Sequence, residues 1–580
     1  MEKDTWKSPL DDLIKENKTI YRTGLFVKNS LLANKKVEFI TRDGSKNINW
    51  YMCGPTVYDK SHLGHARTYI GFDIIRRILE NYFGYNVNLC MNITDIDDKI
   101  IKKVIENADK GEDLYTISRK YEDLFFQDME KLNVKYPDRI TRVTEYIPEI
   151  IEFIQKLIKN DYAYESNNSV YFNINNFLKA GHQYAKLDPT KVGSAEISQE
   201  LDGVLGSENV SDKKNKNDFA LWKKSKDKEP SWSSPFGRGR PGWHIECSVM
   251  CTSVLGKNLD IHSGGYDLKF PHHDNEIAQT EGYYNSHQWI NYFLHTGHLN
   301  INGLKMSKSL KNFLTIDDIM KQGFSANSFR LSFLNHKYDL EMNYTEKGLE
   351  DAYNKDLYIK EYFRTLKRLL SVYNTKQELK YNSKDIEMEN LLIKSKNDVH
   401  EALCNNFSTE TVLEVVNKLI SNFNIYATNA ESSKNKNEFK VSLAYNYGNF
   451  ISYILKCFGL VYKTEFLDNL AETDDSEKII EPFVSAIADY RDDIRNKAIA
   501  KDFKGILQVS DNLRDNILPY LGIRLKDRPN EKAIYSIENK DDLIKEIEFQ
   551  KKLEKQKEDE KRKEKEMKEL KVIKIYIFNI

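Results

Sequence analysis

Two separate stretches of the chain alternate apolar strands with amphipathic helices, and this interrupted alternation constrains the fold most strongly. In the first stretch, residues 48–53 predict a strand, residues 64–83 a helix that ends at Gly84, and residues 86–94 a second strand. Strand, helix and strand in this order form a βαβ unit, whose two strands are parallel. A comparable pattern returns at 226–320. The sequence therefore predicts one α/β domain divided by a long insertion.

The rest of the chain has a different character. From residue 320 to about 525 the apolar residues recur at helical spacing and proline is rare, which predicts an all-helical region. A polar stretch at 187–218 indicates a flexible insertion. Residues 551–571 hold ten basic and seven acidic side chains, which favours a solvated single helix or a disordered extension. The alternative for this tail is a weak RNA-binding or partner-binding arm.

The composition narrows the class of protein. Among 580 residues, 40% are hydrophobic and 30% are charged, a balance typical of soluble globular chains. No apolar run approaches the ~20 residues of a membrane span, and the first residues show no secretory signal. Six cysteines are too few for a disulfide framework and favour a reducing compartment. The net charge of −1 argues against a uniformly basic surface but leaves room for a local basic patch.

The turn between the first predicted strand and helix contains His62-Leu63-Gly64-His65. Two histidines three residues apart at a helix N-terminus present their rings on one side, beside the free backbone N–H groups and the positive end of the helix dipole. Gly64 lets a nucleotide approach the backbone closely. The pattern indicates a phosphate site, although a pair of surface histidines or a metal pair would have the same spacing.

A second motif, Lys305-Met306-Ser307-Lys308-Ser309, follows the second α/β stretch in a loop preceded by glycine. Two lysines and two hydroxyls on a mobile loop suit the clamping of a triphosphate and the stabilisation of charge in a transition state. A solvated basic loop is the alternative. Both motifs in this order, separated by a long insertion, are much more specific than the histidine motif by itself.

A third set of residues has the chemistry of a metal site: Cys53, Cys247, His272 and Glu276. His272 and Glu276 are four residues apart, so on a helix they share one face. Sulfur, imidazole and carboxylate in four positions suit Zn²⁺. The spacing matches no zinc finger, so buried structural cysteines are the alternative, and Cys251 and His273 compete as ligands.

Several motifs together resemble the cysteinyl-tRNA synthetases, which are class I aminoacyl-tRNA synthetases. They are CGPTVYDKSHLGHARTYIGFD, MNITDIDDK, GRPGWHIECSVM, GGYDLKFPHHDNEIAQ and KMSKSLKNF. The resemblance covers residues 48–525, and LRDNILPYLGIRLKD with its charged tail is similar to the eukaryotic cytosolic branch. It implies a Rossmann-like α/β catalytic domain, split by a connective insertion and followed by an all-α anticodon-binding domain.

The resemblance also implies domain boundaries. They are an N-terminal extension at 1–45, the first catalytic half at 46–110, the connective insertion at 111–225, the second catalytic half with the KMSKS loop at 226–320, a stem-contact or linking helical region at 321–390, a helical anticodon-binding domain at 391–530 and a charged tail at 531–580.

The resemblance assigns roles to the matching residues. One Zn²⁺ per chain would be held by Cys53, Cys247, His272 and Glu276, which leaves Cys251 and His273 outside the ligand set. Trp243 resembles a wall of the amino-acid pocket, and Gly54 and Thr94 resemble residues around the main-chain groups of the substrate. ATP, with Mg²⁺, would meet His62, Gly64, His65, Lys305, Ser307 and Lys308.

The implied reaction has two steps. The carboxylate of L-cysteine attacks the α-phosphate of ATP, and the cysteinyl group then passes to the 3′ end of tRNA(Cys). His62, His65, Lys305 and Lys308 would be the catalytic residues, because the phosphoryl step needs alignment and charge neutralisation. We expect a cytoplasmic enzyme without a membrane anchor, either monomeric or homodimeric.

Other residues carry weaker expectations. A basic stripe is a candidate for tRNA contact, with an exposed charged helix face as the alternative: Arg491, Arg495, Lys497, Lys501 and Lys504. Asp95, Asp97 and Asp98 favour helix capping over a substrate role. No protein nucleophile is needed, so Cys90, Cys404 and Cys457 are expected in the core.

Two rival functions share some of these features. A ligase that joins cysteine to a small amine would have the same active-site motifs, but it has no need for a long helical region after KMSKS. A catalytically inactive RNA-binding or zinc-binding scaffold would not require both histidines and both lysines of the two motifs.

Overall fold

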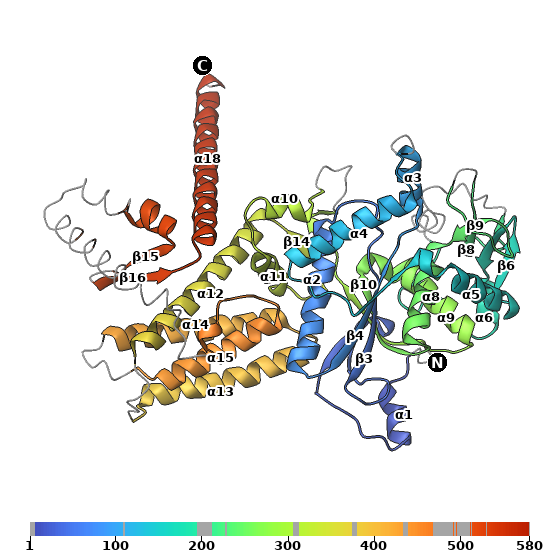
Figure 1. The fold of residues 1–580 in the computed structure, drawn as a ribbon, viewed down its shortest axis with the longest axis horizontal. Helices are drawn as coiled ribbons and strands as arrows, with labels where there is room; N and C mark the ends of the chain where they lie inside the picture. The colour runs from blue at the N-terminus through green and yellow to red at the C-terminus, as the bar shows by residue number, and fades with distance from the viewer. Residues whose placement is uncertain are drawn as a thin grey trace. The chain divides into compact units, whose positions relative to one another are not determined.

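The computed structural model describes residues 6–107, 111–193, 212–226, 229–305, 313–373, 380–432, 439–467, 491, 495, 511, 513–528 and 531–578. The chain divides into two compact units (Figure 1). The larger unit consists of Met1–Asp317, Ser325–Lys360 and Tyr373–Tyr462, and the smaller of Asp318–Phe324, Glu361–Val372 and Lys463–Ile580.

A five-stranded parallel sheet lies at the centre of the larger unit. Its strand order is β11-β10-β3-β4-β5, and every neighbouring pair is parallel. The strands are β3 (Asn47–Met52), β4 (Asn86–Ile93), β5 (Arg139–Arg142), β10 (Leu259–Gly265) and β11 (Ile290–Thr296). The strand order reverses between β3 and β10, and ligands of such sheets bind beyond the carboxyl ends of the strands at that point. The predicted α/β class is confirmed, because strands from both predicted halves form one sheet.

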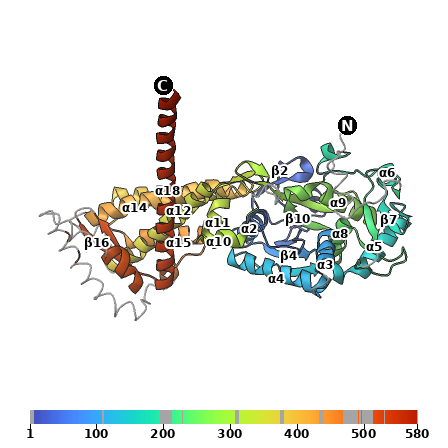
Figure 2. The same cartoon turned by 90° about the horizontal axis from the view of Figure 1, so that it is seen from above.

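Four helices lie next to the edge of the sheet where a ligand would bind. Helix α2 (Leu63–Arg77) connects β3 to β4 and continues through Ile78–Tyr82, and Gly84 then adopts a positive φ of 70°. Helix α3 (Asp98–Glu106) follows β4. Helix α8 (Trp243–Leu255) precedes β10, and α9 (Asp274–Tyr284) connects β10 to β11. Helices α8 and α9 pack side by side, as Figures 1 and 2 show.

A second, antiparallel sheet has the order β6-β7-β8-β9. Its strands are β6 (Ala163–Ser166), β7 (Ser169–Phe172), β8 (Ala220–Lys224) and β9 (Gly239–Pro241). Buried residues of this sheet, including Phe172 and Trp222, share one hydrophobic core with Ile93 of β4 and Phe153 of α5 (Ile147–Lys159). This shared core matters for the site because β9 leads directly into α8.

The larger unit also contains α1 (Pro9–Lys15), α4 (Leu114–Lys131) and α6 (Ile174–Lys179). Helix α4 packs against α3, and Ile174 and Phe177 of α6 belong to the hydrophobic core shared with the second sheet. Strands β1 (Phe26–Asn29) and β2 (Lys35–Glu38) form an antiparallel hairpin. The indole of Trp6 donates a hydrogen bond to the backbone oxygen of Asn291 in β11 at 2.6 Å, which ties the start of the chain to the sheet.

After the second half of the sheet the chain is mainly helical, as predicted. The helices are α10 (Ile316–Met320), α11 (Ala326–Leu334), α12 (Glu346–Val372), α13 (Ser383–Cys404), α14 (Thr409–Ser432) and α15 (Val441–Cys457). The prediction of helix alone is wrong in two places. Strand β14 (Met342–Tyr344) pairs with β12 (Leu299–Ile301), which also pairs with β13 (Leu304–Lys305). Strands β15 (Ile523–Arg528) and β16 (Glu531–Ile537) form a hairpin.

The hairpin has a simple physical cause. Ile523 and Leu525 are buried, whereas Arg524 is half-buried and Lys526 is exposed, and this two-residue period is that of a strand. The predicted helical region ends at about residue 525 and includes only the first residues of the hairpin. The alternating pattern there was too short to stand out from the helical pattern before it.

The charged tail belongs to helix α18 (Lys540–Phe578). Its first turns are anchored in the smaller unit, where Phe549 packs edge-on against Phe324 at 4.8 Å. Further along, Arg562 is exposed and pairs with Asp559 and Glu566, which fits the solvated helix predicted from the charge pattern. Within the described residues, no helix is long and apolar enough to cross a membrane.

Candidate active site and metal centre

A cavity of about 1510 Å³ opens beyond the carboxyl ends of β3, β4 and β10. Most of the predicted site residues that the structure describes line it: Cys53, Gly54, His62, Gly64, His65, Thr94, Trp243, Cys247 and His272. These residues come from both halves of the interrupted α/β domain, so the parallel sheet brings together motifs that are far apart in the sequence.

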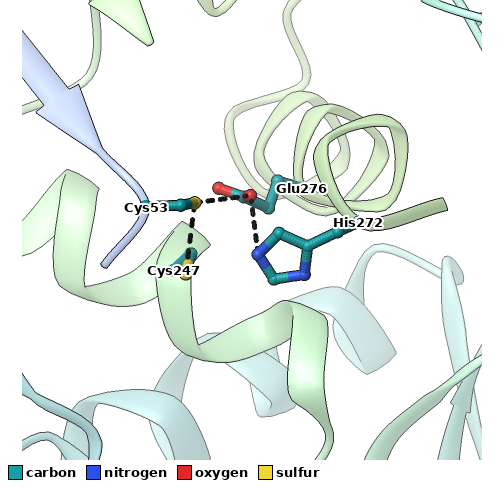
Figure 3. Close-up of side chains that lie close together, drawn as sticks. All are labelled: Cys53, Cys247, His272 and Glu276. Carbon is teal, nitrogen blue, oxygen red and sulfur yellow. Dashed lines mark hydrogen bonds and ion pairs between the residues drawn. The ribbon is translucent and has the colours of Figure 1, made fainter. Parts of the chain in front are cut away.

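Four predicted metal ligands converge at the base of this cavity (Figure 3). Cys53 follows the end of β3 and Cys247 lies on α8, while His272 lies in the turn just before α9 and Glu276 in the first turn of α9. The Sγ atom of Cys53 is 3.9 Å from Sγ of Cys247 and 3.8 Å from Oε1 of Glu276. Nε2 of His272 is 3.1 Å from the same carboxylate oxygen. One donor atom from each residue lies within 4.8 Å of all the others.

The donor set and its environment fit a zinc ion. All four side chains are buried, and two sulfurs, an imidazole and a carboxylate form a set that Zn²⁺ prefers in tetrahedral sites. Burial raises the pKa of Cys53 and of Glu276 and lowers the pKa of His272. Each shift reflects the cost of placing charge in this interior. A divalent cation would supply the opposite charge that the thiolates and the carboxylate need.

Further histidines surround the four residues, and the sequence reasoning did not assign them a role. Nδ1 of His244 lies 3.0 Å from Nδ1 of His272, and Nε2 of His262 lies 2.9 Å from Oε2 of Glu276. Residues that ligate metals are commonly held by such outer hydrogen bonds. The only signal in the sequence was that His244 stands inside the GWHIEC motif and that His262 lies in the middle of a buried strand.

A second combination of donors, Cys53, His262, His273 and Glu276, also lies within 4.8 Å. In that combination His273 is 4.0 Å from Glu276 and makes its short contact elsewhere, at 2.8 Å to His295. His262 contacts the carboxylate oxygen that faces away from Cys53. The geometry therefore favours Cys247 and His272 as the inner pair, with His262 and His273 behind them.

The histidine motif forms the first turn of α2. His62 is the N-cap residue, and its Nδ1 accepts a hydrogen bond from the backbone N–H of His65 at 3.3 Å. The two imidazole rings stack with their centroids 3.7 Å apart. Burial, and then the neighbouring His62, lower the pKa of His65, so this imidazole is neutral near pH 7. A helix N-terminus with two stacked imidazole rings at the cavity wall is suited to phosphate.

Comparison with known proteins agrees with this geometry. A family model described as the tRNA synthetases class I (C) catalytic domain matches residues 39–354. The cytoplasmic cysteine–tRNA ligase of Dictyostelium discoideum is 44% identical, over 93% of this chain and 82% of its own length. The human cytoplasmic cysteine–tRNA ligase is 38% identical, over 90% of this chain and 83% of its own length. This chain belongs to the cysteine–tRNA ligase family.

Solved structures support the fold of this family member independently. The methionyl-tRNA synthetase of Mycobacterium tuberculosis, in complex with methionyl-adenylate, superposes with a TM-score of 0.55 over 74% of this chain and 95% of that chain. The sequence identity is 14%, so the likeness concerns the fold alone. The predicted class I synthetase fold is confirmed.

In this cysteine–tRNA ligase family member, the backbone beside Cys53 is packed too tightly for any side chain. A Cβ atom on Gly54 would lie 1.7 Å from the backbone oxygen of Asn92. The N–H of Gly54 donates to Oδ1 of Asn92 at 2.9 Å, and Nδ2 of Asn92 donates to the hydroxyl of Thr94 at 3.2 Å. Asn92 thus joins the two residues predicted to surround the main-chain groups of the substrate.

Trp243 begins α8 and lies over the metal residues. Its ring stacks on His272 with centroids 4.7 Å apart and an interplanar angle of 29°. Gly242, just before it, leaves no room for a Cβ, which would lie 2.1 Å from the backbone oxygen of Ala220 in β8. The second sheet therefore fixes the start of α8, and with it the aromatic wall of the cavity.

The lysine-rich loop is described only at its first residue. Lys305 ends β13, and its backbone pairs with Asn300 of β12. The side chain of Lys305, together with Ser307 and Lys308, lies outside the described residues, so their predicted contacts with ATP stay predictions.

The acidic residues after β4 have structural partners. Asp97 caps α3 by accepting a hydrogen bond from the N–H of Lys99 at 2.8 Å. Asp95 accepts hydrogen bonds from the N–H and the hydroxyl of Thr144. Asp98 pairs with Arg240 of β9 at 2.6 Å. The predicted helix cap is confirmed for Asp97, whereas Asp95 and Asp98 make other structural contacts.

Two expectations outside the site are corrected. Arg491 is 1% exposed and pairs with Asp527, which contradicts the prediction that it contacts phosphate. Arg495 pairs with the same carboxylate at 2.5 Å, and Lys497, Lys501 and Lys504 lie outside the described residues. Cys90 and Cys457 are buried as predicted.

Cys404 departs from the predicted core position. It is half-buried, and its Sγ lies 3.5 Å from Nε2 of His400, one turn back on the same helix.

Proposed function

We propose that this protein is a cysteine–tRNA ligase that activates L-cysteine with ATP and transfers the cysteinyl group to tRNA(Cys). The observation that carries the proposal is the buried Cys53–Cys247–His272–Glu276 cluster at the base of a cavity whose wall is the start of α2. The relatives' names supply the substrate, and their description as cytoplasmic supports a cytosolic location.

The metal that these four residues would hold is Zn²⁺. Serine has nearly the shape of cysteine, and an apolar pocket separates such near-isosteres by only about 10²-fold. Zinc would select the substrate by binding its thiolate, because it prefers soft sulfur to an alcohol oxygen. The cluster lies beside Gly54 and Thr94, where the main-chain groups of the substrate would be bound, so the thiol side chain can reach it.

The chain's own groups would prepare the first reaction step. His62, His65 and the N-terminal turn of α2 would position the phosphates, and Lys305 and Lys308 would neutralise charge together with Mg²⁺. His65 would act as a neutral hydrogen-bonding group, because burial lowers its pKa. Trp243, stacked on His272, would form the wall that excludes water from the substrate side chain.

The second step requires tRNA. The proposed connective insertion, helical linking region and anticodon-binding domain supply the additional surface for it, with the boundaries given above. This long helical region distinguishes the proposal from a ligase that joins cysteine to a small amine.

Two assays in sequence test the proposal. Cysteine-dependent exchange of pyrophosphate into ATP measures the first step, and charging of tRNA that carries a cysteine anticodon measures the second. We expect both activities, with serine inactive in the exchange. A protein without exchange would be a scaffold, and exchange without charging would indicate the small-amine ligase.

A substitution in the cluster tests the role of the metal. Cys247→Ser should lower cysteine-dependent exchange by about 100-fold or more while ATP binding is retained, because a hydroxyl replaces a thiolate ligand poorly. Cys251→Ser is the matched control, since Cys251 is buried one turn further along α8 but lies outside the four donors. Equal loss of ATP binding and exchange in Cys247→Ser would contradict metal-based selection.

A further inference from the structure

A buried carboxylate in the first turns of α8 lines the cavity and has no part in the site described above. Glu246 is 2% exposed, and it borders the cavity together with Trp243 and Cys247 of the same helix. Within the described part of the chain, its Oε2 atom has no hydrogen-bond partner. A buried carboxylate oxygen without a partner is costly, and native proteins rarely keep one. We therefore looked for a ligand group that would satisfy it.

The geometry of the helix directs Glu246 toward the end of β4. Successive side chains of an α-helix point about 100° apart, so Glu246 projects between its two neighbours in the sequence. Ile245 belongs to the hydrophobic core that contains Ile93, the residue before Thr94, and Cys247 belongs to the metal cluster. Helix α8 also packs directly on β4. The carboxylate thus borders the cavity between Thr94 and the proposed metal ligands.

The cavity wall holds five other carboxylates: Asp59, Asp97, Asp98, Glu106 and Asp267. Asp97 caps α3, and Asp98 pairs with Arg240. The other three are half-buried or exposed, so water can solvate them. Among the described residues of the wall, Glu246 is the acid that combines burial with an oxygen lacking a partner.

L-cysteine has three polar groups that such a site must hold. Its thiolate would reach the metal cluster, and its carboxylate must lie near the phosphates at the start of α2. The ammonium group then lies between these two ends, beside Gly54 and Thr94. Those two residues offer main-chain and hydroxyl groups, which carry no net charge. An ammonium group that leaves water requires a negative partner to offset its lost hydration.

We propose that the carboxylate of Glu246 binds the α-ammonium group of L-cysteine. This inference rests on the proposed function. One charge-assisted contact would satisfy both the carboxylate and the ammonium group. With the thiolate held at the other end, it would fix the orientation of the substrate and turn its carboxylate toward the α-phosphate. Glu246 would also restrict the site to amino acids, because a thiol acid without an ammonium group leaves the buried carboxylate unpaired.

The substitution Glu246→Gln keeps the shape of the side chain and removes its charge. Calorimetric titration of the full-length, zinc-loaded protein measures the binding of L-cysteine and of 3-mercaptopropionate, which has the same thiol and carboxylate but no ammonium group. The Kd of L-cysteine should rise by about 10–100-fold, the range for a hydrogen bond to a charged group. The Kd of 3-mercaptopropionate, the zinc content and the KM for ATP should stay as in the wild type.

Glu281→Gln is the matched control. Glu281 on α9 is also 2% exposed, but it pairs with Lys186 at 2.7 Å and does not line the cavity. This variant should lose stability, because Lys186 loses its partner, while the dissociation constants of both ligands stay unchanged.

The outcomes separate the inference from the proposed function. If the wild type binds neither ligand and shows no cysteine-dependent exchange, the proposed function is wrong and the inference falls with it. If the wild type binds and activates L-cysteine, two results overturn the role of Glu246 while the proposed function stands. An equal loss of both ligands in Glu246→Gln would assign Glu246 a structural role, and unchanged affinities would show that water satisfies the carboxylate.

A second variant covers the case in which Glu246→Gln does not fold. Glu246→Asp keeps the charge and draws it back by one methylene group. A weaker affinity for L-cysteine with an unchanged affinity for 3-mercaptopropionate supports the inference. An equal change for both ligands, or no change for either, overturns it.

Discussion

At the scale of single residues, the site depends on close backbone approach as much as on its chemical groups. Gly54 links a proposed zinc ligand to the strand beside it, and its contact with Asn92 leaves no space for a methyl group. The motif predicted a role for Gly54 near the substrate, but the reason for glycine is visible only when β3 and β4 are side by side.

Gly54→Ala tests this packing. The added methyl group must displace the backbone of Asn92, and we expect a loss of stability of about 1–3 kcal/mol together with a lower zinc content, because Cys53 moves with its neighbour. Differential scanning calorimetry and metal analysis measure both. Gly71→Ala in α2 is the control, since its new methyl group would make an ordinary contact of 3.4 Å with Thr296. A Gly54→Ala protein with normal stability and zinc content would refute the argument.

At the scale of elements, one buried carboxylate joins two strands of the sheet and the segment that precedes β3. Asp260 in β10 accepts hydrogen bonds from the N–H of Arg42 at 2.6 Å and from the N–H of Asn49 in β3 at 2.9 Å. Burial raises the pKa of Asp260 to about 6, despite these two bonds. The position of β10 beside β3, on which the cavity depends, is thus held by a group that titrates under mild conditions.

This shift predicts a pH dependence of stability. The folded protein holds the proton of Asp260 more tightly than the unfolded chain, so its contribution to stability is present at pH below about 4 and is lost as the pH rises towards 6. A shift of about two units corresponds to roughly 3 kcal/mol. Urea unfolding of Asp260→Asn and wild type between pH 4 and 7 measures the slope of the free energy of unfolding against pH. The Asp260→Asn slope should lack the component that Asp260 contributes. An unchanged slope would assign the pH dependence to other groups.

At the scale of the whole molecule, the charged tail and the catalytic machinery lie in different parts of the chain. The cavity and the metal cluster lie within the larger unit, and α18 belongs to the smaller one. The anchoring residues of α18, Leu543 and Phe549, precede the charged stretch at 551–571.

Truncation after residue 555 should therefore leave cysteine-dependent exchange unchanged, because the removed residues of α18 whose side chains are described are exposed, apart from the half-buried Asp559. Charging of tRNA, compared between full-length and truncated protein at low and high salt, then separates the two interpretations of the tail. A solvated helix predicts no difference, whereas an RNA-binding arm predicts weaker charging of the truncated protein that is most evident at low salt. Loss of exchange would show that the tail supports the catalytic unit.

The sequence by itself determined the family, the α/β class and the four candidate metal ligands. Each of these can be inferred from motifs in which the residue types themselves carry the chemistry. Only the tertiary structure decided that Asn92 joins Gly54 to Thr94 and that His244 and His262 contact His272 and Glu276. Such supporting contacts cross strands and helices and follow no fixed spacing. The tertiary structure also decided that Arg491 is buried against Asp527. The spacing of basic residues in a sequence does not reveal whether a carboxylate partner packs against them in the fold.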